Sequence, residues 1–344
     1  MNVLILSKNF KNYKCGHYHQ DIIDAFSDLT NVYLYGPGYD NYEIDDDILD
    51  VISKSPFEEN NIDLIVSSTS WDKEESSKSV DPHPNINLSE IRNIYKVYFL
   101  NKEYKKLGIR FEYIKKQNFD LVCTVHPNAK NWEEEIGVEF LYLPFGISLE
   151  RFRDFGLEKK YDFSFTGNLH KTHTDSRFLA KKQIFQEGSI NSLSNQGWAS
   201  LFKDEMIKTK FKKYRIFWAE WGARNFFLRS ALSNGRKYAQ HMNRTKVSLN
   251  TPSAIGIFNP RFFELMATKS LILCPKGGNY SGLLKDGENC IMYREDMQDF
   301  DEKLIRYIED DSLRSAIVEK AYKDVSNHSY KKRIEFLLNY ISKK

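Results

Sequence analysis

The sequence predicts an α/β fold with two doubly wound domains that face one another across a cleft, followed by C-terminal helices. Both halves of the chain repeat the order strand, glycine-bearing loop, helix, strand, which is typical of parallel sheets covered by helices. The length of 344 residues also exceeds what one hydrophobic core usually serves. We place the boundary in the charged stretch 148–160, giving domains 1–150 and 151–344. The last helix is free in this scheme to pack back on the first domain.

Composition excludes several classes of protein. Hydrophobic residues make up 41% and charged residues 28% of the chain, as in globular proteins. A net charge of +3 is too small to predict bulk binding of nucleic acid. The four cysteines are far apart in apolar runs, so we expect free thiols and a cytoplasmic location. The first residues indicate a strand rather than a signal peptide, and any membrane contact would be peripheral.

The first half begins with a strand at 3–6, a polar loop, a helix at 17–29 and a strand at 32–35. Loops at the carboxyl ends of parallel strands bind ligands. Gly16 and His17 therefore belong either to such a ligand loop or to an ordinary helix start. The acidic run 45–47 and the pair Asp299 and Asp301 are interpreted as solvated turns.

Further strands of this half are expected at 61–67, 119–125 and 138–143. Between them, 91–116 alternates aromatic residues with lysines at near-helical spacing. We expect two surface helices there, the alternative being a basic face that rests on an anionic membrane. His126 follows a strand directly, which favours binding or proton chemistry at the sheet edge, with a capping or packing histidine as the alternative.

The second half restarts with a strand at 161–166 and a turn at Gly167 and Asn168. The loop that follows carries Lys171 and leads to Arg177 at a helix. We interpret these two cations as phosphate partners or as solvated surface residues. Residues 188–245 interleave aromatic and basic side chains, which predicts helices packed on the second sheet more than a nucleic-acid surface.

The most informative stretch, 246–275, predicts strand, loop, helix and strand. Asn259 is a favoured N-cap and Pro260 a favoured first-turn residue, so the helix should begin at Pro260. Free N–H groups at a helix start attract phosphate, and Arg261 lies in the first turn. Glu264, one turn further, is then explained as an acceptor for ribose hydroxyls. The alternative is an ordinary crossover with solvated charges.

Consecutive glycines, Gly277 and Gly278, follow the next strand and precede an expected short helix. They allow close approach of a ligand to the backbone, or form a plain turn. From residue 299 onward the apolar periodicity predicts helices to the end of the chain.

Three segments of this half, 259–267, 271–275 and 284–289, resemble the C-terminal signature of group 1 (family 4-like) glycosyltransferases with the GT-B fold. The nearest branch is similar to the spore-maturation-protein-like set. That likeness also takes in 165–168 followed by Arg177, and 142–147 followed by Phe152. The resemblance covers 140–344, whereas the residues before it match in architecture alone.

The resemblance implies transfer of a sugar from a nucleotide-diphosphate sugar to an acceptor hydroxyl of a glycan or glycoconjugate. Glu264 would bind the ribose, and Arg261 with Lys171 or Arg177 would face the diphosphate. His126 would lie near the transferred sugar, so His126 and Glu264 are the candidate catalytic residues. The implied donor-side residues also include Gly167, Asn168, Asn259, Gly277 and Gly278, and the acceptor-side residues are Gly16 and His17.

Two departures from the family pattern stand out. Gly256 occupies the position, eight residues before Glu264, where a paired glutamate is commoner, and Lys269 replaces a typical helix-ending glycine. Arginine and lysine donors stabilise the leaving diphosphate as its charge grows, so we expect neither metal nor other cofactor. The resemblance favours retention; inversion would require a base such as His126 or Asp72.

Two other functions are alternatives to sugar transfer. A nucleotide-sugar epimerase of the same fold needs no acceptor. A noncatalytic module that binds nucleotide sugars or glycans is suggested by Gly256, since the usual contact to the sugar ring is absent there. Binding of nucleic acid has the least support, because the net charge is nearly balanced.

Overall fold

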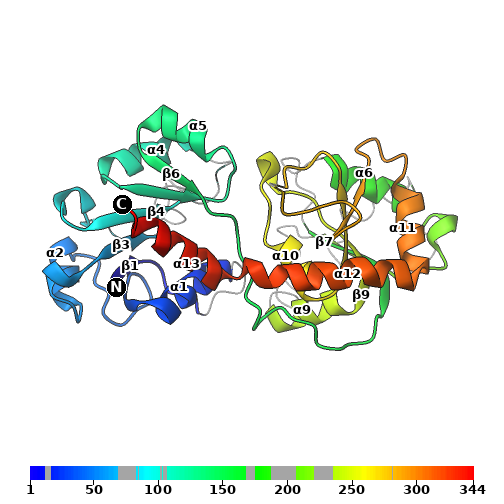
Figure 1. Ribbon diagram of the computed structural model, residues 1–344, viewed down its shortest axis with the longest axis horizontal. Helices are drawn as coiled ribbons and strands as arrows, with labels where there is room; N and C mark the ends of the chain where they lie inside the picture. Colours follow the sequence, from blue (N-terminus) through cyan, green and yellow to red (C-terminus); the bar gives the residue numbers. More distant parts are fainter. Residues whose placement is uncertain are drawn as a thin grey trace. The chain divides into compact units, whose positions relative to one another are not determined.

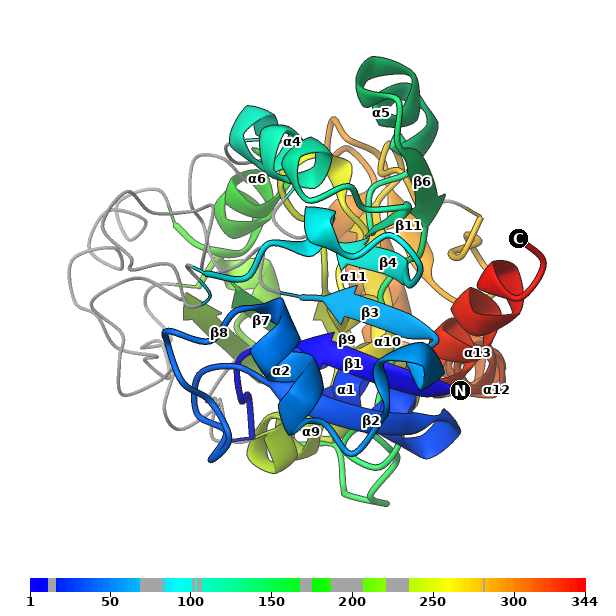
Figure 2. The same ribbon diagram turned by 90° about the vertical axis from the view of Figure 1, so that its left-hand side faces the viewer.

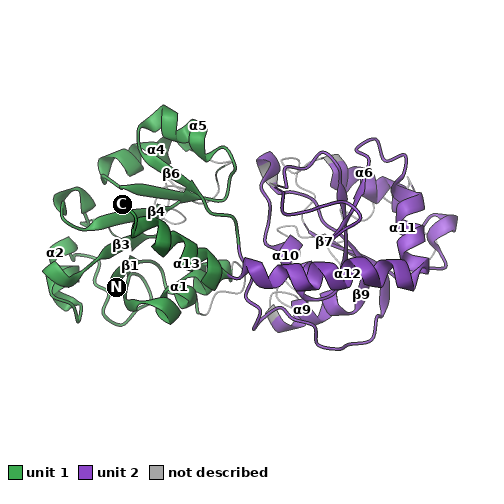
Figure 3. Ribbon diagram, in the orientation of Figure 1, with its two compact units in different colours: residues 1–145, 330–344 green, residues 146–329 purple. Residues whose placement is uncertain are grey.

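The computed structural model of the chain describes two compact units (Figure 3). Unit 1 contains Met1–Phe145 and Tyr330–Lys344, and unit 2 contains Gly146–Ser329. The described residues are 1–11, 17–68, 83, 85–100, 103, 107–167, 175–186, 207–220, 235–280 and 282–344. Three predicted site residues, Gly16, Asn168 and Lys171, lie outside them, as does Asp72.

Unit 1 is built on a six-stranded parallel sheet of order β2-β1-β3-β4-β5-β6 (Figure 2). The chain runs from β1 outward to β2 and then returns to the other side of β1, so the switch point of the sheet lies between β1 and β3. The strands are β1 (Asn2–Leu6), β2 (Asn31–Tyr35), β3 (Leu64–Ser67), β4 (Tyr95–Phe99), β5 (Leu121–Thr124) and β6 (Glu139–Tyr142).

Alternating side chains of β1 divide between two cores, one on each face of this sheet. Leu4 and Leu6 pack with α2 (Ile48–Lys54), α4 (Leu107–Lys116) and α5 (Ala129–Ile136). Val3 and Ile5 pack with α1 (Tyr18–Leu29) and α13 (Tyr330–Ile341), which lie side by side (Figure 1). The last helix thus belongs to unit 1.

Unit 2 repeats the plan with a five-stranded parallel sheet of order β11-β10-β9-β7-β8. Its switch point lies between β7 and β9. One face is covered by α6, α11 and part of α12, and the other by α9, α10 and the rest of α12. The bounds are β7 (Tyr161–Gly167), α6 (Asp175–Ile184), β8 (Ile216–Glu220), α9 (Gly235–Asn243), β9 (Thr245–Leu249), α10 (Arg261–Ala267), β10 (Leu271–Pro275), β11 (Ile291–Tyr293), α11 (Phe300–Glu309) and α12 (Asp311–Val325).

Two doubly wound α/β domains and C-terminal helices are therefore confirmed, but three local predictions are wrong. Part of 91–116 forms strand β4, not a helix, so the aromatic and lysine side chains do not share one basic helical face. Part of 188–245 forms strand β8. Among the described residues after Gly278, the chain reaches β11 through turns, without the expected short helix.

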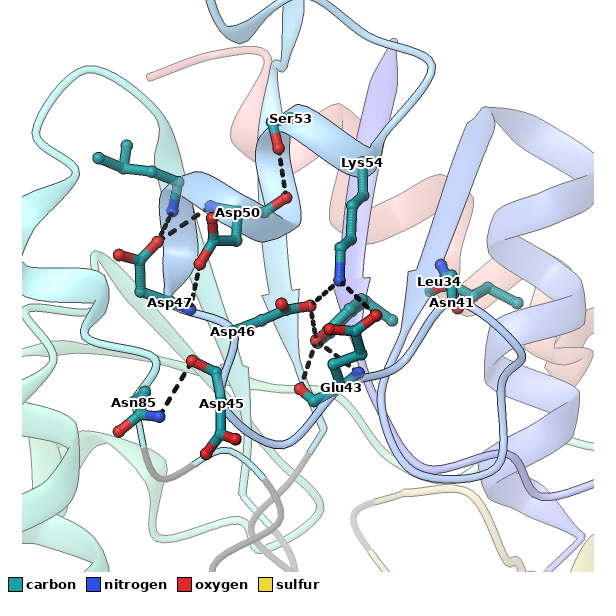
Figure 4. A network of polar contacts seen from close by, with 12 residues as sticks. Leu34, Asn41, Glu43, Asp45, Asp46, Asp47, Asp50, Ser53, Lys54 and Asn85 are labelled. Atoms are coloured by element: carbon teal, nitrogen blue, oxygen red, sulfur yellow. Dashed lines mark hydrogen bonds and ion pairs between the residues drawn. The ribbon is translucent and has the colours of Figure 1, made fainter.

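The acidic run 45–47 is solvated only in part, since Asp45 and Asp47 are exposed and Asp46 is not (Figure 4). Asp46 is buried, accepts a hydrogen bond from the Tyr35 hydroxyl, and pairs with Lys54 Nζ at 2.5 Å. Asp47 caps α2, because its Oδ1 accepts the N–H groups of Leu49 and Asp50 at 2.8 and 2.9 Å. These carboxylates anchor α2 to the sheet rather than forming a cation site.

His241 on α9 gives unit 2 a pH dependence. Its ring packs on Phe217 at 4.1 Å and Tyr161 at 5.2 Å, and burial, then Arg244, lowers its pKa from 6.5 to about 4. Between those values the unfolded chain binds a proton that the folded chain does not. The contribution of His241 to the free energy of unfolding is therefore fully present above about pH 6.5. The free energy of unfolding should fall by about 3 kcal/mol as the pH drops toward 4.

Urea unfolding of wild type and His241→Phe across pH 4–7 measures this effect. The variant should lack the part of the acid slope that comes from His241, and a matching slope in both proteins would contradict the assignment.

Candidate functional site

The switch point of unit 2 places the end of β7 beside the loop that follows β9. Open α/β sheets bind ligands at such a switch point, at the carboxyl edge of the strands. Gly167 ends β7, and Thr251 and Pro252 follow β9. Arg177 on α6 and Arg261 on α10 both reach this edge, and the pKa of Arg177 is lowered by burial and then by the charge of Arg261.

The start of α10 differs from the prediction by one residue. Pro260 itself is the N-cap, and no side chain caps the helix. The Asn259 side chain instead accepts from Asn250 Nδ2 at 3.1 Å and donates to Thr251 O at 2.7 Å. Asn259 therefore closes the loop between β9 and α10. Because α10 has only 7 residues, the positive charge at this edge comes from side chains more than from the helix.

Arg261 is the cation best placed to meet an anion. Its Nε donates to the Tyr238 hydroxyl at 2.7 Å, and a Cβ built on Gly167 would lie 3.4 Å from its Nη1. Burial opposes its charge, but Tyr238 and Glu264 outweigh burial and the pKa of Arg261 is raised. Its Nη groups donate no hydrogen bond within the part of the chain that the structure describes, so they can donate to a ligand.

Arg177 is not a solvated surface residue, which was one of its two expected roles, and its role as a phosphate partner stays a prediction. It is buried, with Nε 2.5 Å from Thr251 Oγ1 and Nη2 3.3 Å from the carbonyl oxygens of Thr251 and Pro252. Burial, followed by the charge of Arg261, lowers its pKa to about 10. Arg177 thus holds the loop after β9 in place, and part of its donor capacity is used within the chain.

Glu264 lies one helical turn after Arg261. Its negative charge contributes to the raised pKa of Arg261 and, after burial, to that of Tyr238. Its backbone N–H bonds to Pro260 O at 3.0 Å, inside the first turn. The side chain is half-buried, so it can accept hydrogen bonds from a ligand while it balances the charge of Arg261.

Gly277 and Gly278 follow β10 at the same edge, and both are covered by side chains of the unit. A Cβ on Gly277 would come within 1.5 Å of Glu295 Oε1, and one on Gly278 within 2.3 Å of the Tyr280 ring. Tyr280 is itself fixed by a 2.6 Å bond to Pro275 O. Packing within the chain therefore requires glycine at position 278, whereas the exposed Glu295 side chain could move away from a larger residue at position 277.

His126 lies in unit 1, just beyond β5. Its Nδ1 accepts the Asn128 N–H at 3.1 Å, and its ring packs on Trp132 at 5.0 Å. Its own N–H bonds to Thr124 Oγ1 at 3.1 Å. The neutral imidazole then carries its proton on Nε2, a tautomer that donates at this atom and cannot act there as a base.

Unit 1 has a pocket at the carboxyl edge of its sheet, beside the first turn of α1. His17 precedes this turn and is half-buried. Most of the wall is apolar, and Arg333 on α13 reaches it with Nε 3.4 Å from Phe145 O. The lining residues are Tyr18, His19, Ile22, Ser68, Phe99, Leu100, Cys123, Thr124, Val125, Leu143, Pro144, Phe145, Tyr330, Arg333 and Ile334.

The structure thus brings Gly167, Arg177, Arg261 and Glu264 together in unit 2, while His17 and His126 lie in unit 1. Sequence reasoning missed Tyr238 and Thr251, which contact the two arginines. Within the described parts of the chain, no group of three or more His, Cys, Asp or Glu side chains is arranged to hold a metal ion. No helix among them is long and apolar enough to cross a membrane.

Comparison with known proteins shows the fold of the chain and a family match over part of it. Residues 200–339 match the family model described as glycosyl transferase-like. Solved glycosyltransferases share the fold of the whole chain. The chain has the GT-B fold. Its placement in the spore-maturation-protein-like branch stays a prediction, and no curated protein sequence matches this chain.

Three solved structures illustrate the shared GT-B fold. HepE of Anabaena, in complex with UDP-glucose, is 15% identical with a TM-score of 0.60, and all of each chain is covered. Sucrose-phosphate synthase of Thermosynechococcus elongatus is 9% identical with a TM-score of 0.56 and 99% of each chain covered. A glycosyltransferase of Rickettsia africae is 11% identical with a TM-score of 0.53, covering 98% of this chain and 97% of its own.

Proposed function

We propose that this protein is a glycosyltransferase that transfers a sugar from a UDP-sugar to a hydroxyl of a glycan or glycoconjugate, without a metal and with retention of configuration. The observation that carries the proposal is the pair Arg261 and Glu264 at the switch point of unit 2. The pair supplies a cation for a diphosphate and, one helical turn away, a carboxylate for ribose hydroxyls. The UDP and UDP-glucose held by the HepE structures support uridine as the nucleoside of the donor.

In this reaction the bond between the sugar C1 and the diphosphate oxygen breaks, and a bond from C1 to the acceptor oxygen forms. The acceptor proton passes to the departing diphosphate, which carries away the bonding electrons. Arg261 opposes the negative charge that grows on the diphosphate, and this stabilises the transition state more than the ground state. Arg177 contributes by holding the loop after β9, and His126 contributes by donating from Nε2 rather than as a base.

A cytoplasmic location is part of the same proposal. Cys123, Cys274 and Cys290 are buried free thiols, and unpaired cysteines are usual in a reducing compartment.

Calorimetric titration with UDP, GDP, CMP and dTDP tests the donor, followed by incubation with UDP-glucose and a panel of glycans. UDP should bind most tightly and raise the melting temperature, and NMR of the product should show the donor's anomeric configuration. Failure of every nucleotide to bind would refute the proposal. Products formed with donor alone would instead indicate an epimerase, and binding without turnover a noncatalytic module.

The pocket of unit 1 is where we place the acceptor, because it lies at the carboxyl edge of the sheet near His17. Its aromatic wall should favour an acceptor with an apolar substituent. A phenyl glycoside should show a lower KM than the matching methyl glycoside, and Tyr18→Ala should remove about fivefold of that preference. Phe336→Ala, an exposed residue of α13, is the control. An equal preference in the Tyr18 variant and wild type would exclude the pocket.

A further inference from the structure

We infer that Tyr238 is a positioning residue of the donor site, whose hydroxyl fixes the orientation in which Arg261 meets the diphosphate. This inference rests on the proposed function, since it concerns how the same site binds its donor. Tyr238 lies on α9, outside every segment that the sequence assigned to the donor, and its hydroxyl is 2.7 Å from Arg261 Nε.

The phenol must be the acceptor in this bond, because a guanidinium group has donors alone. The hydroxyl lies 3.5 Å from Thr166 Oγ1 on β7, and the ring meets Phe152 edge-on at 6.2 Å between centroids. Tyr238 is therefore held by the sheet and by the core of the unit. Its place does not depend on a ligand.

The hydrogen bond at Nε fixes the orientation of the whole guanidinium group, because this group is planar and rigid. With Nε–H bound to Tyr238, the plane of the group is fixed, and the edge formed by the two Nη groups points in a different direction within that plane. One of them, Nη1, is the atom next to Gly167 at the end of β7. Both Nη groups are then presented as a fork, the geometry that binds a phosphate through two hydrogen bonds.

Electrostatic repulsion from Arg177 opposes this orientation of Arg261. The charge of Arg261 contributes to the lowered pKa of Arg177, so the two guanidinium groups repel one another. Without the bond to Tyr238, Arg261 would gain freedom to rotate away from its neighbour. Donor binding would then include the free energy of restoring the orientation.

Tyr238→Phe tests this inference, because it removes the hydroxyl and keeps the ring. Affinities for UDP, inorganic pyrophosphate and uridine are measured by calorimetry at pH 7.5. UDP and pyrophosphate should bind about tenfold more weakly to the variant, and uridine should bind as it does to wild type. Tyr214→Phe is the matched control, since it loses a 2.6 Å bond to Glu309 outside the site and should keep wild-type affinities.

The possible results separate the positioning role of Tyr238 from the proposed function. Unchanged UDP affinity in Tyr238→Phe overturns the positioning role while leaving the proposed function intact. An equal loss for UDP and uridine also overturns it, because a general structural defect does not distinguish the diphosphate. If wild type binds none of these ligands, the proposed function fails together with this inference. Should Tyr238→Phe not fold, Thr166→Val must give the same selective loss, and its absence refutes the role.

Discussion

Arg261→Lys should lower kcat/KM for the UDP-sugar by about 100-fold, the largest effect that we expect from one conservative change. Lysine keeps the charge but cannot form two parallel bonds to a phosphate. It also loses the bond from Nε to Tyr238. Two charge-assisted hydrogen bonds, each contributing about 1.5 kcal/mol or more, account for this factor.

Steady-state kinetics with the donor varied, together with calorimetry of UDP, measure the loss. Arg294→Lys is a suitable control, because this exposed arginine pairs with Asp296 at 2.6 Å on the surface of the same unit. Activity within threefold of wild type in Arg261→Lys would remove Arg261 from the diphosphate site.

Glu264→Ala should weaken UDP binding by roughly 30-fold, because two hydrogen bonds from ribose hydroxyls to a carboxylate are lost. Alanine favours the helix, so α10 should remain intact. The sharper comparison uses 2′,3′-dideoxy-UDP, which has no hydroxyls to offer. Its affinity should be the same in wild type and variant.

Glu302→Ala, an exposed glutamate in the first turn of α11, controls for the loss of one negative charge from the unit. If dideoxy-UDP loses affinity as much as UDP does, Glu264 acts through Arg261 and not through the ribose.

Much of the fold could be predicted from the sequence, because most strands are short continuous apolar runs followed by glycine-bearing loops. Strand β4 was missed because Lys96 interrupts its apolar pattern. Lys96 is nevertheless buried, and its Nζ donates to Leu88 O and Ile91 O at 3.2 and 2.9 Å. The residue types alone do not predict that the carbonyl groups of the preceding loop will solvate this ammonium group.

The candidate site could likewise be predicted only in part. Arg261 and Glu264 follow a strand and open a helix, so their place at the sheet edge could be predicted. The partners of the two arginines could not, since Tyr238 comes from a helix before β9 and Thr251 meets Arg177 only once β7 and β9 pair. Whether a buried arginine faces a ligand or its own backbone is decided by tertiary contacts that spacing does not encode.

Helix α13 has a consequence for how the chain reaches its native state. The face of the unit 1 sheet that carries Val3 and Ile5 is covered in part by Tyr330, Ile334 and Leu337. During synthesis from the N-terminus, that apolar surface stays open while the ribosome makes all 184 residues of Gly146–Ser329. The unit translated first is thus the one finished last, and a chaperone that shields apolar strands would serve it throughout that interval.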